Sequence, residues 1–199
     1  MKSFNVVELL NDLKSITEQN IEFVRDRLTI LSHSQLIWKK DHNTWSVNEI
    51  LAHLNEYAAY YNKTMALKIE RTRFREPREL FMSSPLGKSA WSSMKLGNAK
   101  NIKRTVHSPK MYNPSLNSSI SQENVLKTFE KNQLELIQIL ESCSQVNLRK
   151  VRIPISISKI IRLRLGDALM FVVYHNERHI QQIANLLYAP GFPSNSTER

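Results

Sequence analysis

The sequence predicts an all-α fold in a single domain that spans residues 1–199. The 199 residues include only four glycines. Four long segments carry apolar residues at intervals of three and four, the spacing that places them along one face of a helix. With 41% hydrophobic residues, a chain of this length can bury a continuous core without disulfide bonds. We therefore expect long helices packed against one another in one globular unit.

The first two helices are expected from about Asn5 to Leu31 and from Ser46 to about Arg73. Asn5 is suited to cap the first helix. Ser46 and Glu49 form a capping box, in which the serine hydroxyl accepts from the third helical N–H and the glutamate reaches back to the serine amide. The apolar stripes are Val6, Leu9, Leu10, Leu13, Ile16, Ile21, Val24 and Leu28 in the first helix, and Ile50, Leu51, Leu54, Ala58, Tyr61 and Met65 in the second.

The last two helices are expected from about Ser121 to Cys143 and from about Gly166 to Tyr188. Pro190 and Gly191 follow the fourth segment directly and are residues that end a helix. The stripe of the third segment consists of Val125, Phe129, Leu134, Ile137 and Leu140.

Two long connections separate these helices. Residues 75–119 hold four prolines and many serines, and loops of this length usually carry function. We expect a crossover that covers one end of the helices, with short helical pieces around residues 86–96. The second connection, residues 146–163, contains an alternating segment at 153–157 that is typical of a short β-strand. Two long connections among four helices indicate a bundle with crossovers.

The single cysteine, Cys143, excludes an internal disulfide. A lone thiol without a signal peptide is typical of a reducing cytosol, so we expect a cytoplasmic protein. No stretch approaches the roughly 18 apolar residues of a membrane span. We therefore expect a soluble chain with no membrane partner.

Lysine and arginine outnumber aspartate and glutamate by 28 to 18, which gives a formal net charge of +10. This charge can reflect solvated loops, attraction of a small anionic substrate, or binding of nucleic acid. Nucleic acid is the weakest of these interpretations, because the sequence has neither a recognition motif nor interleaved aromatic and basic residues. The basic residues concentrate outside the helix interiors, at Arg71, Arg73, Arg75, Arg78, Lys100, Lys103, Arg104, Arg149, Lys150, Arg152, Lys159, Arg162 and Arg164.

His175 and His179 are candidate metal ligands. They lie four residues apart on the fourth predicted helix, so both imidazoles project from one face and can bind the same ion. Such pairs also arise by chance on exposed faces. Here the apolar stripe turns both imidazoles toward the core, where unpartnered they would lose hydration that a metal restores. His53, two turns into the second helix, can face them if the two helices are neighbours, although a lone histidine there is more often an ordinary core residue. The shared stripe consists of Ala168, Val172, Ile183 and Leu186.

The other three histidines, His33, His42 and His107, lie in connections and are weaker candidates. The segment also lacks the zinc-protease signature, in which a glutamate directly follows the first histidine as general base. That position is Asn176 here, and Glu177 points off the metal face. Peptidase chemistry of that type is therefore not expected.

Two stretches resemble motifs of the DinB-like superfamily. Residues 45–54, with the sequence WSVNEILAHL and followed by Tyr60 and Tyr61, resemble its second-helix motif. The sequence LGD at 165–167, leading into HNERHIQQI at 175–183, resembles its fourth-helix motif.

This resemblance implies a four-helix bundle of up-down-down-up topology with a long crossover between helices two and three, often assembled as a homodimer. It implies one divalent metal ion, most often zinc or nickel, bound by His53, His175 and His179. Family members with known activity include thiol S-transferases that use bacillithiol, and many other members have no established reaction.

Three neutral imidazoles leave at least one coordination position open, which distinguishes a catalytic site from a closed structural one. An ion there can lower the pKa of bound water or hold a thiol as thiolate. Cys143 lies at the end of its helix and is not expected to close the site as a fourth ligand. We expect a metal-dependent thiol S-transferase or hydrolase acting on a small substrate, thiol-containing or anionic. The alternatives are a metal-binding or sensor bundle without turnover and, more remotely, a nucleic-acid-binding protein.

Overall fold

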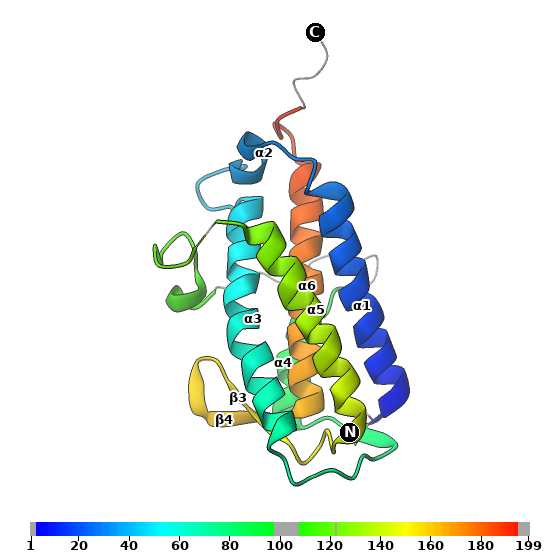
Figure 1. The fold of residues 1–199 in the computed structure, drawn as a ribbon. Coiled ribbons are helices and arrows are strands. Elements are labelled where there is room, and N and C mark those ends of the chain that lie inside the picture. Colours follow the sequence, from blue (N-terminus) through cyan, green and yellow to red (C-terminus); the bar gives the residue numbers. More distant parts are fainter. Residues whose placement is uncertain (1–2, 98–107, 122, 195–199) are drawn as a thin grey trace.

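The computed structural model describes residues 3–97, 108–121 and 123–194, and these are mainly helical (Figure 1). The all-α prediction is confirmed, with four short strands added to it. The helices are α1 (Val6–Arg27), α2 (His33–Ile37), α3 (Val47–Glu70), α4 (Pro85–Met94), α5 (Val125–Ser142) and α6 (Leu165–Leu187), with the 3-10 turns η2 (Lys110–Tyr112) and η3 (Cys143–Gln145). The strands are β1 (Ser3–Asn5), β2 (Leu80–Met82), β3 (Arg152–Ile155) and β4 (Ser158–Arg164).

The four long helices α1, α3, α5 and α6 coincide with the four predicted segments. The Asn5 side chain accepts from the Val7 and Glu8 amides at 2.9 and 3.2 Å and caps α1. The capping box at the start of α3 is formed as predicted, because the Glu49 amide donates to Ser46 Oγ and the Ser46 amide donates to Glu49 Oε2. Local sequence signals therefore set where these two helices begin.

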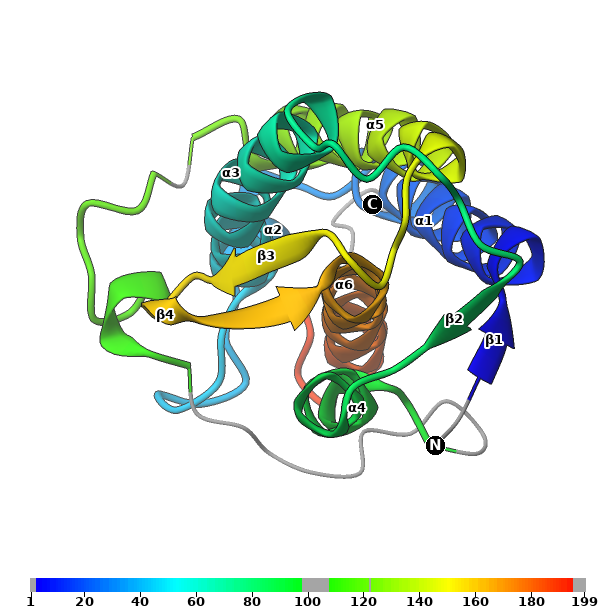
Figure 2. The ribbon, with the colours of Figure 1, turned by 90° about the horizontal axis from the view of Figure 1, so that it is seen from below.

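Each long helix packs against two of the others: α1 contacts α5 and α6, and α3 also contacts α5 and α6. In Figure 1, α1 and α6 run upward while α3 and α5 run downward. Seen along the helices in Figure 2, α4 lies on the far side of α6 from α5. Buried apolar residues fill the space between the helices in two clusters, one around Leu13, Met65 and Leu169 and the other around Leu28 and Ile50.

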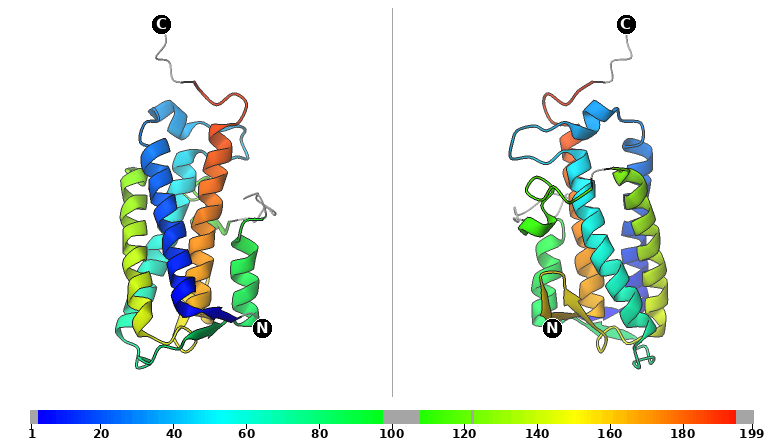
Figure 3. Two further views of the ribbon diagram at one scale, coloured as in Figure 1. Left: turned by 90° about the vertical axis from the view of Figure 1, so that its right-hand side faces the viewer. Right: turned by 60° about the vertical axis from the view of Figure 1, so that its left-hand side comes forward.

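The long connections contain more regular structure than the sequence predicts. The helical piece expected around residues 86–96 is α4, and the strand expected at 153–157 is β3, which ends at Ile155. Strand β4 pairs antiparallel with β3, and β1 pairs antiparallel with β2 to join two segments far apart in sequence. Figure 3 shows α4 beside the long helices. The pairs β1–β2 and β3–β4 and the short helix α2 were not predicted.

A buried carboxylate ties α4 to α6. Asp167, in the first turn of α6, is fully buried and accepts hydrogen bonds from Ser83 Oγ, the Ser84 amide and Ser84 Oγ. Ser84 is also the N-cap of α4. A Cβ on Gly87 would lie 2.0 Å from Asp167 Cγ, so only glycine allows this approach. The crossover is therefore attached to the start of the helix that carries His175 and His179.

His107 and the basic residues Lys100, Lys103 and Arg104 lie outside the described residues. Among the described helices, none combines the length and the apolar character needed to cross a membrane.

Candidate metal centre

The structure brings His53, His175 and His179 together. His53 comes from α3, and the other two come from successive turns of α6, which packs against α3. One ring nitrogen of each histidine lies within 4.8 Å of the other two. His53 is 2% exposed and His175 is 5% exposed, whereas His179 is only partly buried. The predicted juxtaposition is present, and His179 is the most exposed of the three residues.

Hydrogen bonds orient two of the imidazoles. His53 Nδ1 lies 2.6 Å from the Tyr112 carbonyl oxygen and His179 Nδ1 lies 2.9 Å from Gln182 Oε1. Both partners are acceptors, so each Nδ1 carries the proton and donates it. In the neutral ring this leaves the Nε2 lone pair free, as for a metal-ligating histidine with an oriented second nitrogen.

The spacing of the Nε2 atoms suits a common ion. His53 Nε2 and His175 Nε2 are 3.2 Å apart. Nitrogens about 2.0–2.1 Å from a tetrahedral zinc ion are separated by about 3.3–3.4 Å. An ion can therefore bind both nitrogens with a small adjustment, and His179 is close enough to complete the set.

Burial favours the neutral form of all three histidines. It lowers the pKa of His53 to about 4. Burial, followed by the neighbouring imidazoles of His179 and His53, lowers the pKa of His175 well below its ordinary value. Burial and then His53 do the same for His179. At neutral pH the cluster thus presents unprotonated nitrogens, the form that binds divalent metals.

Aromatic side chains line the cluster. The Trp45 ring lies 4.9 Å from His53 and 6.2 Å from His179, centroid to centroid. Tyr57 lies 4.9 Å from His53 and 4.6 Å from His175, and Phe171 stacks on His175 at 5.8 Å. Trp45 also packs against the core, but it is only partly buried. The walls of the site are therefore largely aromatic, and Trp45 and Phe171 are partly buried.

Glu49 acts on the site indirectly. Besides capping α3, its carboxylate accepts from Lys39 Nζ at 2.9 Å and from Ser115 Oγ at 2.8 Å. The Ser115 contact holds the segment whose Tyr112 carbonyl orients His53. Glu49 therefore supports the orientation of His53 through this segment.

Two contacts of the site were missed from the sequence. The Tyr112 carbonyl carries no side-chain signal, because any residue could supply it. Phe171 lies four residues before His175, so the helical spacing that relates His175 to His179 could have identified it.

The weaker candidates lie apart from the cluster. His33 and His42 are exposed. Cys143 is a buried free thiol whose pKa is raised by burial, and it is not part of the metal-binding group found among the described residues. Asn176 donates to Gln133 Oε1 at 3.1 Å inside the protein, so the position of the protease base has a packing role here.

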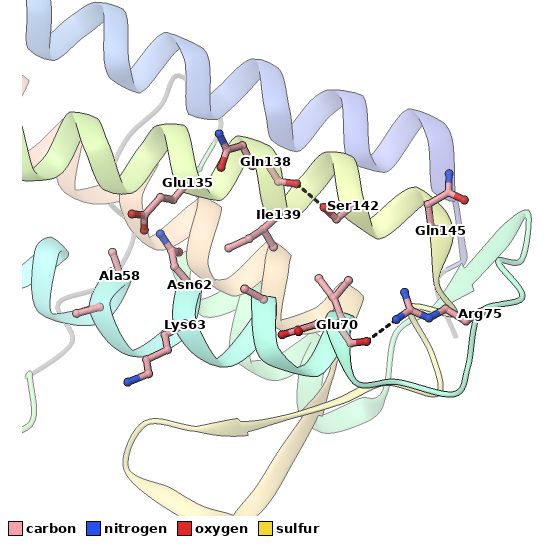
Figure 4. A pocket seen from close by; sticks show the side chains of 13 residues that line it. Ala58, Asn62, Lys63, Glu70, Arg75, Glu135, Gln138, Ile139, Ser142 and Gln145 are labelled. Carbon is pink, nitrogen blue, oxygen red and sulfur yellow. Dashed lines mark hydrogen bonds between the residues drawn. The ribbon is translucent and has the colours of Figure 1, made fainter.

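A prominent groove of the described structure is not lined by the histidines. That groove has a volume of about 620 Å³ and lies between α3 and α5 (Figure 4). Its rim mixes the cations Lys63 and Arg75 with the anions Glu70 and Glu135. No residue of the cluster lines it, so the groove and the candidate metal centre are separate features.

A family model described as the DinB superfamily matches residues 16–183, a span that contains all three histidines. Comparison with curated proteins and with solved structures found no match.

Proposed function

The chain belongs to the DinB superfamily, and on that premise we propose that it is an enzyme that binds one divalent metal ion through His53, His175 and His179. The observation that carries the proposal is the convergence of three buried or partly buried imidazoles, two of which have Nδ1 committed to an acceptor. Three neutral imidazoles whose ring nitrogens converge offer lone pairs that one divalent cation can bind together.

The donor set suits zinc or nickel, since neutral imidazole binds both. An ion held by three histidines supplies Lewis acidity and lowers the pKa of a water or thiol in the open position. The chain's own residues keep the three imidazoles neutral, fix their rotation through Tyr112 and Gln182, and surround them with Trp45, Tyr57 and Phe171.

For the reaction we propose thiol S-transfer, as in bacillithiol-dependent relatives, or hydrolysis of a small substrate. The aromatic walls support an apolar reacting group, because they exclude water from the side of the site that they cover. Basic residues outside the helix interiors support an anionic thiol as co-substrate, attracted at long range.

We also propose the topology, the oligomeric state and the cellular location of the protein. The helix directions and contacts support a single-domain bundle of up-down-down-up topology over residues 1–199. We propose a homodimer because members of the family often assemble as homodimers. Cytoplasmic location is proposed because Cys143 is a free, buried thiol, which fits a reducing compartment.

Metal analysis of protein purified without an affinity tag tests the metal site. We expect about one ion per chain, and loss of most of it in His175→Ala and in His179→Ala, with helical circular dichroism retained. His33→Ala is the matched control, because His33 is exposed and outside the cluster. Full occupancy in both cluster variants would refute the metal assignment.

Turnover is tested with the metal-loaded protein, small thiols and an electrophile. Chelation should abolish activity, and addition of zinc or nickel should restore it. One observation favours a second candidate, a metal-binding or sensor bundle without turnover: two prominent grooves of the described structure do not include the histidines. A fully metallated protein that binds no thiol, and whose cobalt-substituted form shows no exchangeable water, would support that candidate instead.

A further inference from the structure

The β3–β4 hairpin carries a concentrated positive charge. Residues 149–164 include six lysines and arginines and no acidic residue. In Figures 1 and 2 the hairpin projects beside α3, at the end of the molecule where α6 begins. Within the described part of the chain, no arginine of this hairpin forms an ion pair, because the four ion pairs there all involve other residues.

The base of the hairpin is fixed to the protein. Ile153 and Leu163 face each other across the strands, and both are buried. The Tyr60 hydroxyl lies 3.3 Å from the carbonyl oxygens of residues 154 and 155 and donates toward them, and the Ser156 amide donates to Tyr61 Oη at 3.3 Å. These contacts hold the hairpin against the rest of the protein, and its exposed end extends from them.

The tip exposes three isoleucines. Ile160 is 90% exposed, Ile157 is 60% exposed and Ile161 is 44% exposed. Arg152 and Arg162 are also exposed. We call these five residues the hairpin patch. Side chains two apart on a strand share a face, and Pro154 pairs with Arg162, so Arg152 and Arg162 lie on one face of the hairpin. The pairing shifts register between Pro154 and Ile155, and the exposed Ile157, Ile160 and Ile161 belong to this irregular end.

The arginines repel one another. The register places Arg152 directly opposite Arg164, and like charges at such positions destabilise a strand pair. Burial, followed by the charges of Arg149 and Arg152, lowers the pKa of Arg164. An anionic partner would relieve this repulsion.

We propose that the hairpin patch binds the surface of a membrane rich in anionic lipids. Ile157 and Ile160 enter the boundary between headgroups and acyl chains, while Arg152 and Arg162 contact lipid phosphates. A combination of exposed apolar side chains and adjacent cations is what such a surface binds. The contact is peripheral and needs no spanning helix. It revises the expectation of no membrane partner, which rested only on the lack of a spanning segment.

Two other occupants fit the patch less well. A nucleic acid backbone would neutralise the arginines but would give the isoleucines no apolar environment. A second copy of this chain, paired through the same patch, would bring two positively charged clusters together. Both remain outcomes that the experiment can detect.

Vesicle co-sedimentation of the full chain tests the proposal. We expect binding to vesicles of phosphatidylcholine mixed with phosphatidylglycerol, no binding to phosphatidylcholine alone, and weaker binding as salt is raised. The double variant Ile160→Ser/Arg162→Gln should weaken binding by at least about fivefold, the contribution expected from one arginine at an anionic surface. The matched control Ile30→Ser/Arg71→Gln also removes one exposed isoleucine and one exposed arginine, outside the patch, and should bind like the wild type.

Three results would overturn the proposal. One is equal loss of binding in the hairpin variant and the control, which would indicate net charge alone. Another is absence of binding to the anionic vesicles. The third is a hairpin variant that keeps vesicle binding but loses duplex DNA binding or changes oligomeric state in sedimentation. Circular dichroism of both variants establishes that the helices are retained.

Discussion

Acid should destabilise the metal-free protein by protonating its buried histidines, and the effect can be worked out for His53. Its pKa in the folded protein is lowered to about 4 by burial, whereas an imidazole in the unfolded chain titrates near about 6.5. As pH falls, the unfolded state takes up the proton first. The stability contributed by neutral His53 is therefore complete above about pH 6.5 and is lost between about pH 6.5 and 4. At about 1.36 kcal/mol per pH unit, this loss is about 2 kcal/mol between pH 6.5 and pH 5.

The assay is urea unfolding followed by circular dichroism, with chelator present, at about pH 7 and about pH 5. His53→Asn removes the titrating ring but keeps an N–H near the position of Nδ1, where it can still donate to the Tyr112 carbonyl. We expect this variant to lose about 2 kcal/mol less than the wild type on acidification. Burial also lowers the pKa of His175 and His179, so their protonation likewise destabilises the folded protein in acid. Both residues are present in the wild type and in the variant.

His33→Asn is the control, because His33 is exposed and its replacement should leave the acid dependence unchanged. If His53→Asn loses as much free energy of unfolding on acidification as the wild type, the reasoning from a buried neutral imidazole is refuted.

Three further substitutions test the supports of the site. Gln182→Ala should weaken zinc binding by about 10–100-fold in calorimetric titration, because it removes the acceptor for His179 Nδ1; Gln181→Ala, whose amide bonds Asn185 on the surface, should not. Gly87→Ala should lower the free energy of unfolding by about 1–3 kcal/mol, because its Cβ would collide with Asp167; unchanged urea unfolding would contradict the tight approach of α4 to α6. Ser46→Ala should cost about 1 kcal/mol in the same measurement by removing the capping box of α3, and a neutral result would show that packing alone fixes this helix start.

The helices were predictable because their signals are local. Asn5 and Ser46 mark helix starts with their own side chains, and the three- and four-residue stripes identify the buried faces. The pairing of Ser3 with Met82 was not predictable in this way, because three-residue strands far apart in sequence leave no periodic pattern. Strand β4 was hidden for a related reason: Ile160 and Ile161 are consecutive, so the alternation of a half-buried strand is interrupted.

The residues of the candidate metal site also divide into those that local sequence signals predicted and those that they did not. His175 and His179 were recognisable from a spacing within one helix, and His53 from a motif around it. Their role as ligands stays a prediction, but their proximity is now a structural observation. The Tyr112 carbonyl belongs to a segment placed by the tertiary contact between Ser115 and Glu49. This hydrogen-bond partner of His53 could therefore be identified only from the folded structure.

The distribution of the three histidines along the chain has a consequence for the order in which the site assembles. His53 and His175 are 122 positions apart, whereas His175 and His179 share one helix. During synthesis, His53 is therefore produced well before the two histidines with which it clusters. If the proposed ion binds, an unfolded chain can still hold it weakly through His175 and His179 alone, which reduces the stabilisation that the ion confers on the native state. Binding of the proposed ion by all three histidines therefore requires α3 and α6 to be packed together, because His53 lies on α3 and the other two histidines lie on α6.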